Sequence, residues 1–302
     1  MAVKRIPLNF FQLVPLEEEN EKEAGKAQLN AIKTVLATLP ATFLPINLSE
    51  SRVYLYGSII QRNGLYFGTL LRNQVANIPP SYDETDAKLE PLPFSNTQGL
   101  AYQTSFLFDP TYRILMLESV KNGVGISTVC DFINLNYPNV SIQPALVIDP
   151  QKLQDFFNMT TISRFSVKIA KLESGSIFSN KTNTSLGQII KSADKTNTDT
   201  IEYALTAHRK NSLNKGRISG LVRSLLRYND TEEVQKLLVV GKEDDEGRRE
   251  SIDLIDQKLR DSIEVERVRL ISTFPVDEHY LKMEQTYATH KPHLSIYKTK
   301  AV

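Results

Sequence analysis

The sequence predicts an α+β fold: a mixed or antiparallel sheet domain with helices, plus a smaller ferredoxin-like α+β domain. Residues 161–171 alternate between apolar and polar side chains, which is the period of a half-buried strand. Apolar residues in 215–228 recur at helical spacing, which indicates a helix with one buried face. Strand-like and helical segments do not alternate as a regular βαβ repeat, which favours an α+β arrangement.

The first predicted domain covers residues 1–157 and reads as a meander of strands. Asn63-Gly64 separates two β-rich runs and predicts a tight hairpin, because both residues accept positive φ at low cost. Asp109-Pro110 predicts a second turn, in which the carboxylate binds nearby amides. The Pro-rich segment 77–96 is expected to be a surface excursion. We expect strands at 3–14, 51–61, 65–72, 99–108, 112–120 and 140–148, and helices at 26–39, 126–135 and 151–157. Asp149-Pro150 is expected to cap the last of these helices.

The second predicted domain covers residues 158–270. A strand, a short helix and a second strand, followed by a helix and further strands, resemble a ferredoxin-like module. The helix expected at 276–287 is predicted to pack back on the first domain together with the rest of 271–302, which would make 158–270 an inserted, mobile domain. Its expected strands are 161–171, the alternating first part of 198–210, 234–241, 250–255 and 260–268, and its expected helices are 186–190 and 215–228.

Composition predicts a globular protein with balanced charge, without an internal disulfide and without a membrane-spanning segment. With 302 residues, 41% of them hydrophobic, the chain has enough apolar material for real cores. Lys and Arg number 36 against 35 Asp and Glu, so electrostatic binding has to come from local patches. The single cysteine, Cys130, cannot form an internal disulfide and is expected to be a buried core residue. No apolar run reaches membrane-spanning length, so we expect a cytoplasmic protein without membrane insertion.

The helix at 215–228 carries the clearest preference for a partner. Its apolar stripe faces a core, while basic side chains extend along the outer face and toward its start. Lys and Arg side chains and the amides of a helix start hold phosphate backbones. The alternative is a solvated face on an ordinary core helix. The candidate nucleic-acid-binding residues are Arg209, Lys210, Lys215, Arg217, Arg223 and Arg227.

No strong catalytic motif is present. The Gly123-Val124-Gly125 segment lacks the further residues of a phosphate-binding loop, and it is expected to turn the chain into a helix. His290 and His293 could be two ligands of a metal ion, but no third metal ligand lies near them in the sequence. They are expected to lie on an exposed tail. One fragment resembles a metal-dependent nuclease, because carboxylates holding Mg²⁺ and a lysine orienting water could cleave a phosphodiester. Its residues are Asp253, Asp256 and Lys258, and a charged hairpin explains them equally well.

The order of elements resembles a family of phage and bacterial proteins that includes the lambdoid exclusion protein RexA, with the defence protein KwaB as a more distant relative in layout. The resemblance rests on the strand pair 54–71, the pair 106–117 with its following helix, the alternating strand 165–170 and the segment 237–247. It implies a globular domain with a second domain that swings, a homodimer, and sequence-nonspecific DNA binding linked to phage exclusion.

Together these observations favour a DNA-binding protein of phage exclusion or antiviral defence, with RNA as an alternative ligand and no cofactor. A second defence protein is a candidate partner. A metal-dependent nuclease that uses Mg²⁺ and a non-enzymatic, protein-binding regulator are the two alternatives.

Overall fold

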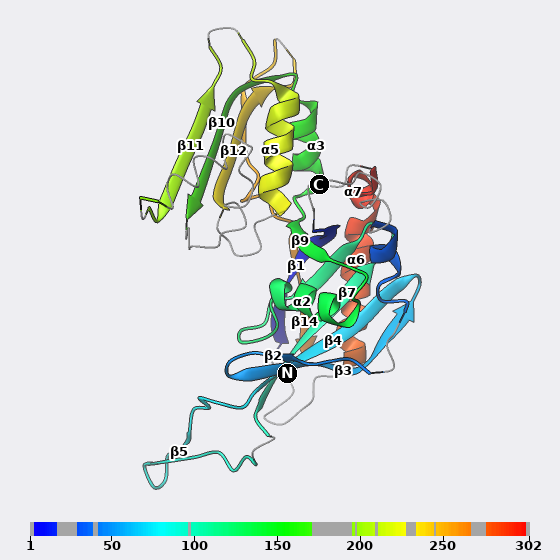
Figure 1. Ribbon diagram of the computed structural model, residues 1–302, viewed down its shortest axis with the longest axis vertical. Coiled ribbons are helices and arrows are strands. Elements are labelled where there is room, and N and C mark those ends of the chain that lie inside the picture. Colours follow the sequence, from blue (N-terminus) through cyan, green and yellow to red (C-terminus); the bar gives the residue numbers. More distant parts are fainter. Residues whose placement is uncertain are drawn as a thin grey trace. The chain divides into compact units, whose positions relative to one another are not determined.

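The computed structural model describes residues 3–16, 29–38, 42–95, 98–170, 195–196, 198–208, 211–227, 234–244, 246–266 and 276–299. It confirms the α+β class, with helices and antiparallel sheets (Figure 1). The chain divides into two units, and their bounds differ from those of the predicted domains, 1–157 and 158–270. Unit 1 comprises Met1–Asn9, Pro15–Ile142 and Arg260–His290, and unit 2 comprises Phe10–Val14, Gln143–Leu259 and Lys291–Val302.

The sheet of unit 1 runs in the order β14-β1-β8-β7-β4-β3-β2. Neighbouring strands from β2 to β8 pair antiparallel, with the segment that contains β5 and β6 inserted between β4 and β7, which agrees with the predicted meander. β14 was expected in the second domain, and this is corrected: it pairs with β1, from Val3 opposite Glu266 to Asn9 opposite Arg260. The strands are β1 (Val3–Pro15), β2 (Ile46–Asn47), β3 (Ser51–Arg62), β4 (Leu65–Gln74), β7 (Leu100–Asp109), β8 (Ile114–Glu118) and β14 (Arg260–Glu266).

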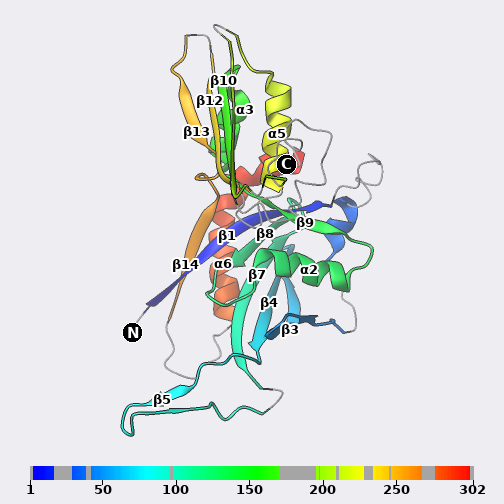
Figure 2. The same cartoon turned by 60° about the vertical axis from the view of Figure 1, so that its left-hand side comes forward.

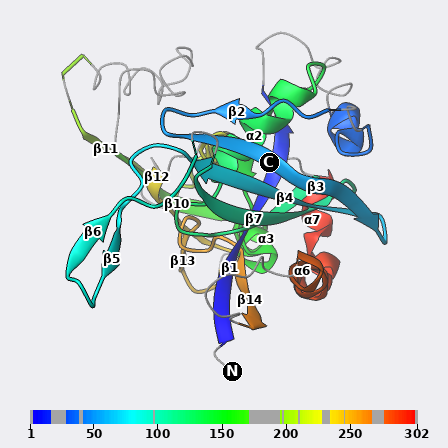
Figure 3. The same cartoon turned by 90° about the horizontal axis from the view of Figure 1, so that it is seen from below.

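Both predicted turns are confirmed. Asn63 has φ 51° and Gly64 has φ 75°, as a tight hairpin between β3 and β4 requires. Asp109 ends β7, and its Oδ1 accepts a hydrogen bond of 2.7 Å from the amide of Thr111. The Pro-rich excursion contains an unpredicted hairpin of β5 (Ser81–Asp83) and β6 (Lys88–Glu90), which stands apart from the sheet strands (Figure 3).

Two helices, α2 (Ile126–Asn136) and α6 (Val276–His290), lie on opposite sides of β7 (Figures 2 and 3). Cys130 of α2 is buried, as predicted. On α6, the Tyr280 hydroxyl lies 3.0 Å from Thr69 Oγ1 of β4, so a buried polar contact fixes this helix on the sheet. None of the helices in the described residues has the length and apolar character needed to cross a bilayer.

The segment after α6 corrects the expected exposed tail. His290 still belongs to α6, and its Nε2 lies 2.7 Å from Oδ2 of Asp261. A 3-10 helix, η2 (Lys291–Ser295), and α7 (Ile296–Thr299) follow. His293 is exposed, but Tyr297 is fully buried in unit 2, where its hydroxyl donates to the carbonyl of Ile148 over 2.8 Å.

Unit 2 contains an antiparallel sheet in the order β11-β10-β12-β13, with α3 and α5 on one of its faces (Figures 1 and 2). The predicted alternation is confirmed in β10, where Phe165, Val167 and Ile169 are buried. The helix expected at 186–190 lies outside the described residues, and the ferredoxin-like module stays a prediction. The elements are β9 (Ile142–Leu146), which pairs with β1, α3 (Pro150–Asn158), β10 (Thr161–Ala170), β11 (Thr200–Thr206), α5 (Lys215–Arg227), β12 (Val234–Lys242) and β13 (Glu250–Asp253).

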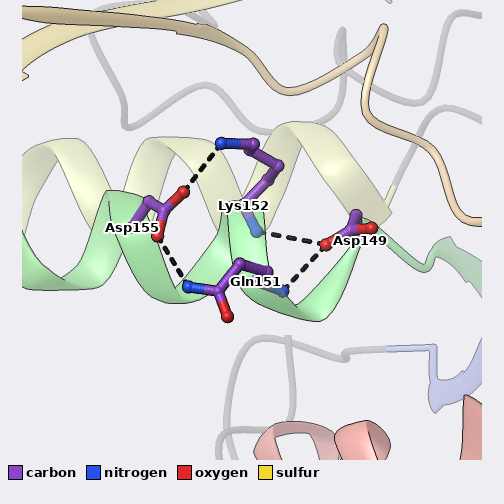
Figure 4. A network of polar contacts seen from close by, with 4 residues as sticks. All are labelled: Asp149, Gln151, Lys152 and Asp155. Carbon is purple, nitrogen blue, oxygen red and sulfur yellow. Dashed lines mark hydrogen bonds and ion pairs between the residues drawn. The ribbon is translucent and has the colours of Figure 1, made fainter.

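The start of α3 shows how local sequence sets a helix boundary. Asp149 Oδ1 accepts hydrogen bonds from the amides of Gln151 (2.8 Å) and Lys152 (3.3 Å), and Pro150 occupies the first helical turn (Figure 4). One turn later, Asp155 accepts from Lys152 Nζ at 2.9 Å and from Gln151 Nε2 at 3.0 Å. The Asp149 cap was predicted from the Asp-Pro pair, and it is confirmed.

Candidate functional site

The sequence of α5 accounts for its helical structure. Asn214 precedes the helix, and its Oδ1 accepts a hydrogen bond of 3.0 Å from the amide of Arg217, which satisfies one free donor of the first turn. Ile218, Val222 and Leu225 point into the core at helical spacing and are almost fully buried. The predicted basic, amphipathic helix is therefore present with the buried stripe that was expected.

Two of the predicted phosphate-binding side chains of α5 contact α3 instead of lying free on the surface. Lys215 Nζ donates a hydrogen bond of 2.6 Å to the carbonyl of Phe157, in the last turn of α3. The Arg223 guanidinium lies over the Phe157 ring, 5.7 Å from Cζ to the ring centroid. The last carbonyls of a helix lack intrahelical donors, so the Lys215 hydrogen bond stabilises the packing of α5 on α3. The contact of Arg223 with the Phe157 ring stabilises the same packing.

The other predicted basic residues divide into two groups. Arg217 is exposed near the start of α5, where it can reach a ligand. Arg227 ends the helix, and Arg209 and Lys210 lie outside the described residues. Only Arg217 thus has a described side chain that matches the predicted surface role.

The nuclease-like fragment is organised around a strand end. Asp253 ends β13, and its Oδ1 accepts hydrogen bonds from the amides of Leu237 (3.1 Å) and Ile255 (3.2 Å). Asp256 is exposed, and Lys258 forms an isolated β-bridge with Ile148. Within the part of the chain that the structure describes, no three or more His, Cys, Asp or Glu side chains form a group that could hold a metal ion. The two hydrogen bonds give Asp253 a structural role, because they tie the end of β13 to β12 and to the turn that follows.

The face of the unit 2 sheet opposite α3 and α5 carries basic residues that the sequence had not singled out. Arg164 is exposed although β10 is a central strand, so none of the described helices covers this part of the face. We call it the open sheet face. Its residues are Arg164, Ser166 and Lys168 of β10, Glu202, Ala204 and Thr206 of β11, Lys236, Leu238 and Val240 of β12, and Ser251 and Asp253 of β13.

Strand register brings two positive charges together on this face. Lys168 of β10 lies directly opposite Lys236 of β12. Glu202 of β11 is the neighbour of Lys168 on its other side, so a row of one carboxylate and two ammonium groups crosses three strands. Like charges at directly opposed positions destabilise a sheet, and an anion bound between them relieves the repulsion. With Arg164 two positions along β10, the open sheet face has an excess of positive charge.

The segment that leads from β11 to α5 is anchored beside this face. The amide of Ala207 donates to the carbonyl of Ser163 (2.9 Å), and the amide of Leu213 donates to the carbonyl of Ile162 (2.8 Å). Both anchors lie on β10 next to Arg164. The chain on either side of Arg209 and Lys210 is thus tied to the strand that carries the exposed cation.

The chain belongs to a family of unknown function, DUF6731, whose model matches residues 1–297. The match includes residues of both units, so the two occur together in the architecture of this family. No curated protein matches the chain.

Proposed function

We propose that this DUF6731 protein binds nucleic acid, DNA in the first place, without sequence selectivity and through unit 2. The observation that carries the proposal is the opposed pair Lys168 and Lys236, on the same open sheet face as Arg164. Such an arrangement costs folding free energy, which phosphate groups offset by binding between the cations. Phosphate contacts of this kind supply the sequence-independent part of nucleic-acid binding.

The chemistry of the open sheet face favours contacts with the backbone over contacts with bases. Its described side chains include no aromatic ring, because Tyr203 of β11 lies opposite Val167 and belongs to the covered face. Stacking on aromatic rings is how open sheets hold unpaired bases. Leu238 and Val240 supply apolar surface between the cations, but neither has a hydrogen-bonding group that reads a base. Binding through phosphates is therefore weakly selective.

The start of α5, which packs on the other face of the sheet, is a second basic element of unit 2. Arg217 is exposed there, and the free amides of the first turn add positive partial charge. The amides of Ala207 and Leu213, on either side of Arg209 and Lys210, donate to the carbonyls of Ser163 and Ile162 on the strand that carries Arg164. Arg209 and Lys210 remain members of the proposed site on the strength of their charge.

The proposed biological role is phage exclusion or antiphage defence in the cytoplasm, by a homodimer that acts alone or with a second defence protein. The support for this role is the resemblance in layout to phage exclusion proteins, together with a surface suited to phosphate. The structure provides no observation that favours the nuclease alternative over binding. That alternative is therefore an outcome to be tested for and not a second proposal.

The test is fluorescence anisotropy of the full chain with a random-sequence DNA duplex at low salt. Lys168→Glu/Lys236→Glu should weaken binding at least about tenfold, since reversal replaces attraction to phosphate with repulsion. Lys88→Glu, on the exposed hairpin of unit 1, is the matched control and should bind like the unaltered protein. Equal affinity of the control and the double variant would contradict the proposed site.

Two further arms of the same experiment separate the alternatives. Competition with single-stranded and double-stranded RNA of equal length tells whether DNA is preferred. Incubation of labelled duplex with Mg²⁺, followed by a denaturing gel, tells whether the strand is cut, and cleavage lost in Asp256→Asn would support the nuclease. If the protein binds none of these nucleic acids saturably, the proposed function is contradicted and the protein-binding regulator is favoured.

A further inference from the structure

Unit 1 contains a pocket that the proposed nucleic-acid surface does not use. Its cavity volume is ≈ 320 Å³, and residues of β1, β7, the end of β8 and the start of α6 line it. A volume of this size is within the range of small-molecule sites in proteins, which begins at about 300 Å³. Its charged and hydrogen-bonding lining includes Lys4, Arg5, Tyr102, Glu118, Lys121 and His279.

A buried histidine and glutamate pair forms one wall of the pocket. His279 Nδ1 of α6 lies 2.6 Å from Glu118 Oε1 of β8, and their side chains are only 5% and 2% exposed. The other carboxylate oxygen of Glu118 accepts a hydrogen bond of 2.9 Å from the amide of Ser105. The Glu118 carboxylate therefore links β7 to α6 and positions the imidazole of His279.

Three cationic residues line the same cavity. Lys4 and Arg5 are adjacent on β1, and Lys121 follows the end of β8. Arg5 also donates from Nε to Ser262 Oγ over 2.7 Å, which holds its guanidinium at the sheet edge beside β14. With Glu118 as the one carboxylate among the lining residues, the pocket has an excess of positive charge.

The first turn of α6 adds to the positive potential. Val276, its first residue, lines the pocket, and the amides of a first helical turn have no acceptor within the helix. Asp277 does not line the cavity, and its carboxylate pairs with Arg62 over 3.1 Å. Glu278, the other carboxylate of this turn, does not line the cavity either, so the helix start can assist an anion there.

We infer that this pocket binds a small organic phosphate. The three cations and the helix start suit the phosphate group, and His279, held by Glu118, supplies a further polar contact. Ile6, Val120 and Val276 form apolar wall against which the organic part of the ligand packs. The site lies wholly in unit 1, so this inference does not depend on nucleic-acid binding by unit 2.

Isothermal titration calorimetry of the full chain with AMP tests the inference. AMP should bind saturably, inorganic phosphate should bind more weakly, and adenosine, which lacks the charged group, should not bind. Lys121→Glu and Arg5→Glu change exposed side chains, and each should weaken AMP binding at least about tenfold through charge repulsion. Circular dichroism of both variants checks that the fold is retained.

Two controls assign the binding to this pocket. Lys282→Glu changes a cation of α6 that does not line the cavity and should leave AMP affinity unchanged. Lys168→Glu/Lys236→Glu should also leave it unchanged, which separates the pocket from the open sheet face. If neither AMP nor inorganic phosphate binds, or if AMP binds Lys121→Glu and Arg5→Glu as tightly as the unaltered protein, the inference is overturned.

Discussion

The Tyr287 hydroxyl donates a hydrogen bond of 2.9 Å to Oδ2 of Asp109, and so joins α6 to the turn between β7 and β8. Tyr287 is 0% exposed and Asp109 is 1% exposed. Burial, followed by the nearby charge of Asp109, raises the pKa of Tyr287 well above its ordinary value, so the phenol remains a donor over the usual pH range. The contact closes unit 1 by joining segments far apart in the sequence.

We therefore expect Tyr287→Phe to lower the free energy of unfolding by about 1–3 kcal/mol, because a buried carboxylate oxygen loses a donor while the ring remains. Urea unfolding monitored by circular dichroism measures the change. Tyr82→Phe removes a hydroxyl from a residue that is 59% exposed and is the matched control. A loss for Tyr287→Phe no greater than that for Tyr82→Phe would show that the buried hydrogen bond adds no stability.

Gly68 of β4 is a second site at which a single methyl group tests the packing. It lies opposite Phe106 of β7, and an added Cβ would stand 2.5 Å from the ring atom Cζ. Since Phe106 is buried, Gly68→Ala should destabilise unit 1 by about 1–3 kcal/mol. Gly220→Ala in α5 meets no atom within 4 Å and should instead stabilise unit 2 by about 0.5–1 kcal/mol. Equal effects in thermal unfolding would contradict both expectations.

Salt dependence of DNA binding offers an independent check on the open sheet face. Each phosphate contact with B-DNA makes the slope of log K against log salt concentration steeper by about 0.9. Lys236→Gln should therefore make the slope shallower by about 0.9. It should also raise the free energy of unfolding by roughly 0.2–0.5 kcal/mol, because Lys168 loses a like charge opposite it. Lys88→Gln should change neither quantity, and a Lys236→Gln slope equal to that control would remove this lysine from the interface.

The acidic limit of stability should depend in part on Asp155. Burial alone would raise its pKa, but hydrogen bonds from Lys152 and Gln151 and the charge of Lys152 outweigh burial and lower it. A carboxyl with a lowered folded pKa stabilises the protein above its unfolded pKa of about 3.9, and this contribution is lost as the pH falls through the folded pKa.

Asp155→Asn should thus lower the free energy of unfolding by about 0.3–0.5 kcal/mol near neutral pH, because the ion pair is partly exposed to solvent. The difference should shrink steadily as the solution is acidified below about pH 4. Denaturant titrations across the acidic range measure it, with Asp256→Asn on the exposed turn of the same unit as the control. A difference that grows on acidification has the opposite sign and would contradict the lowered pKa.

Features set by neighbouring residues could be predicted from the sequence. The Asn63-Gly64 hairpin follows from the φ values that those residues accept, and the Asp149 cap follows from a carboxylate placed just before a helix. The alternation in β10 shows which of its side chains face the core. These features need no knowledge of the rest of the fold.

Features set by which segments become neighbours could not be predicted. Lys236 falls within the strand predicted at 234–241, but only strand order and register put it opposite Lys168. Helical spacing likewise indicated Arg223 as a surface residue, whereas its position over Phe157 depends on where α3 packs. Glu118 and His279 gave no local signal of their 2.6 Å contact, because each is an isolated residue in its own segment.

The pairing of β1 with β14 has a consequence for biosynthesis. Strand β1 is translated long before its partner between Arg260 and Glu266, because the two segments lie far apart in the sequence. Until then the outer edge of β1 has no strand to receive its amide and carbonyl groups, and such an edge invites pairing with other chains. The edge formed by residues 3–9 is therefore open to pairing with other chains until β14 has been synthesised.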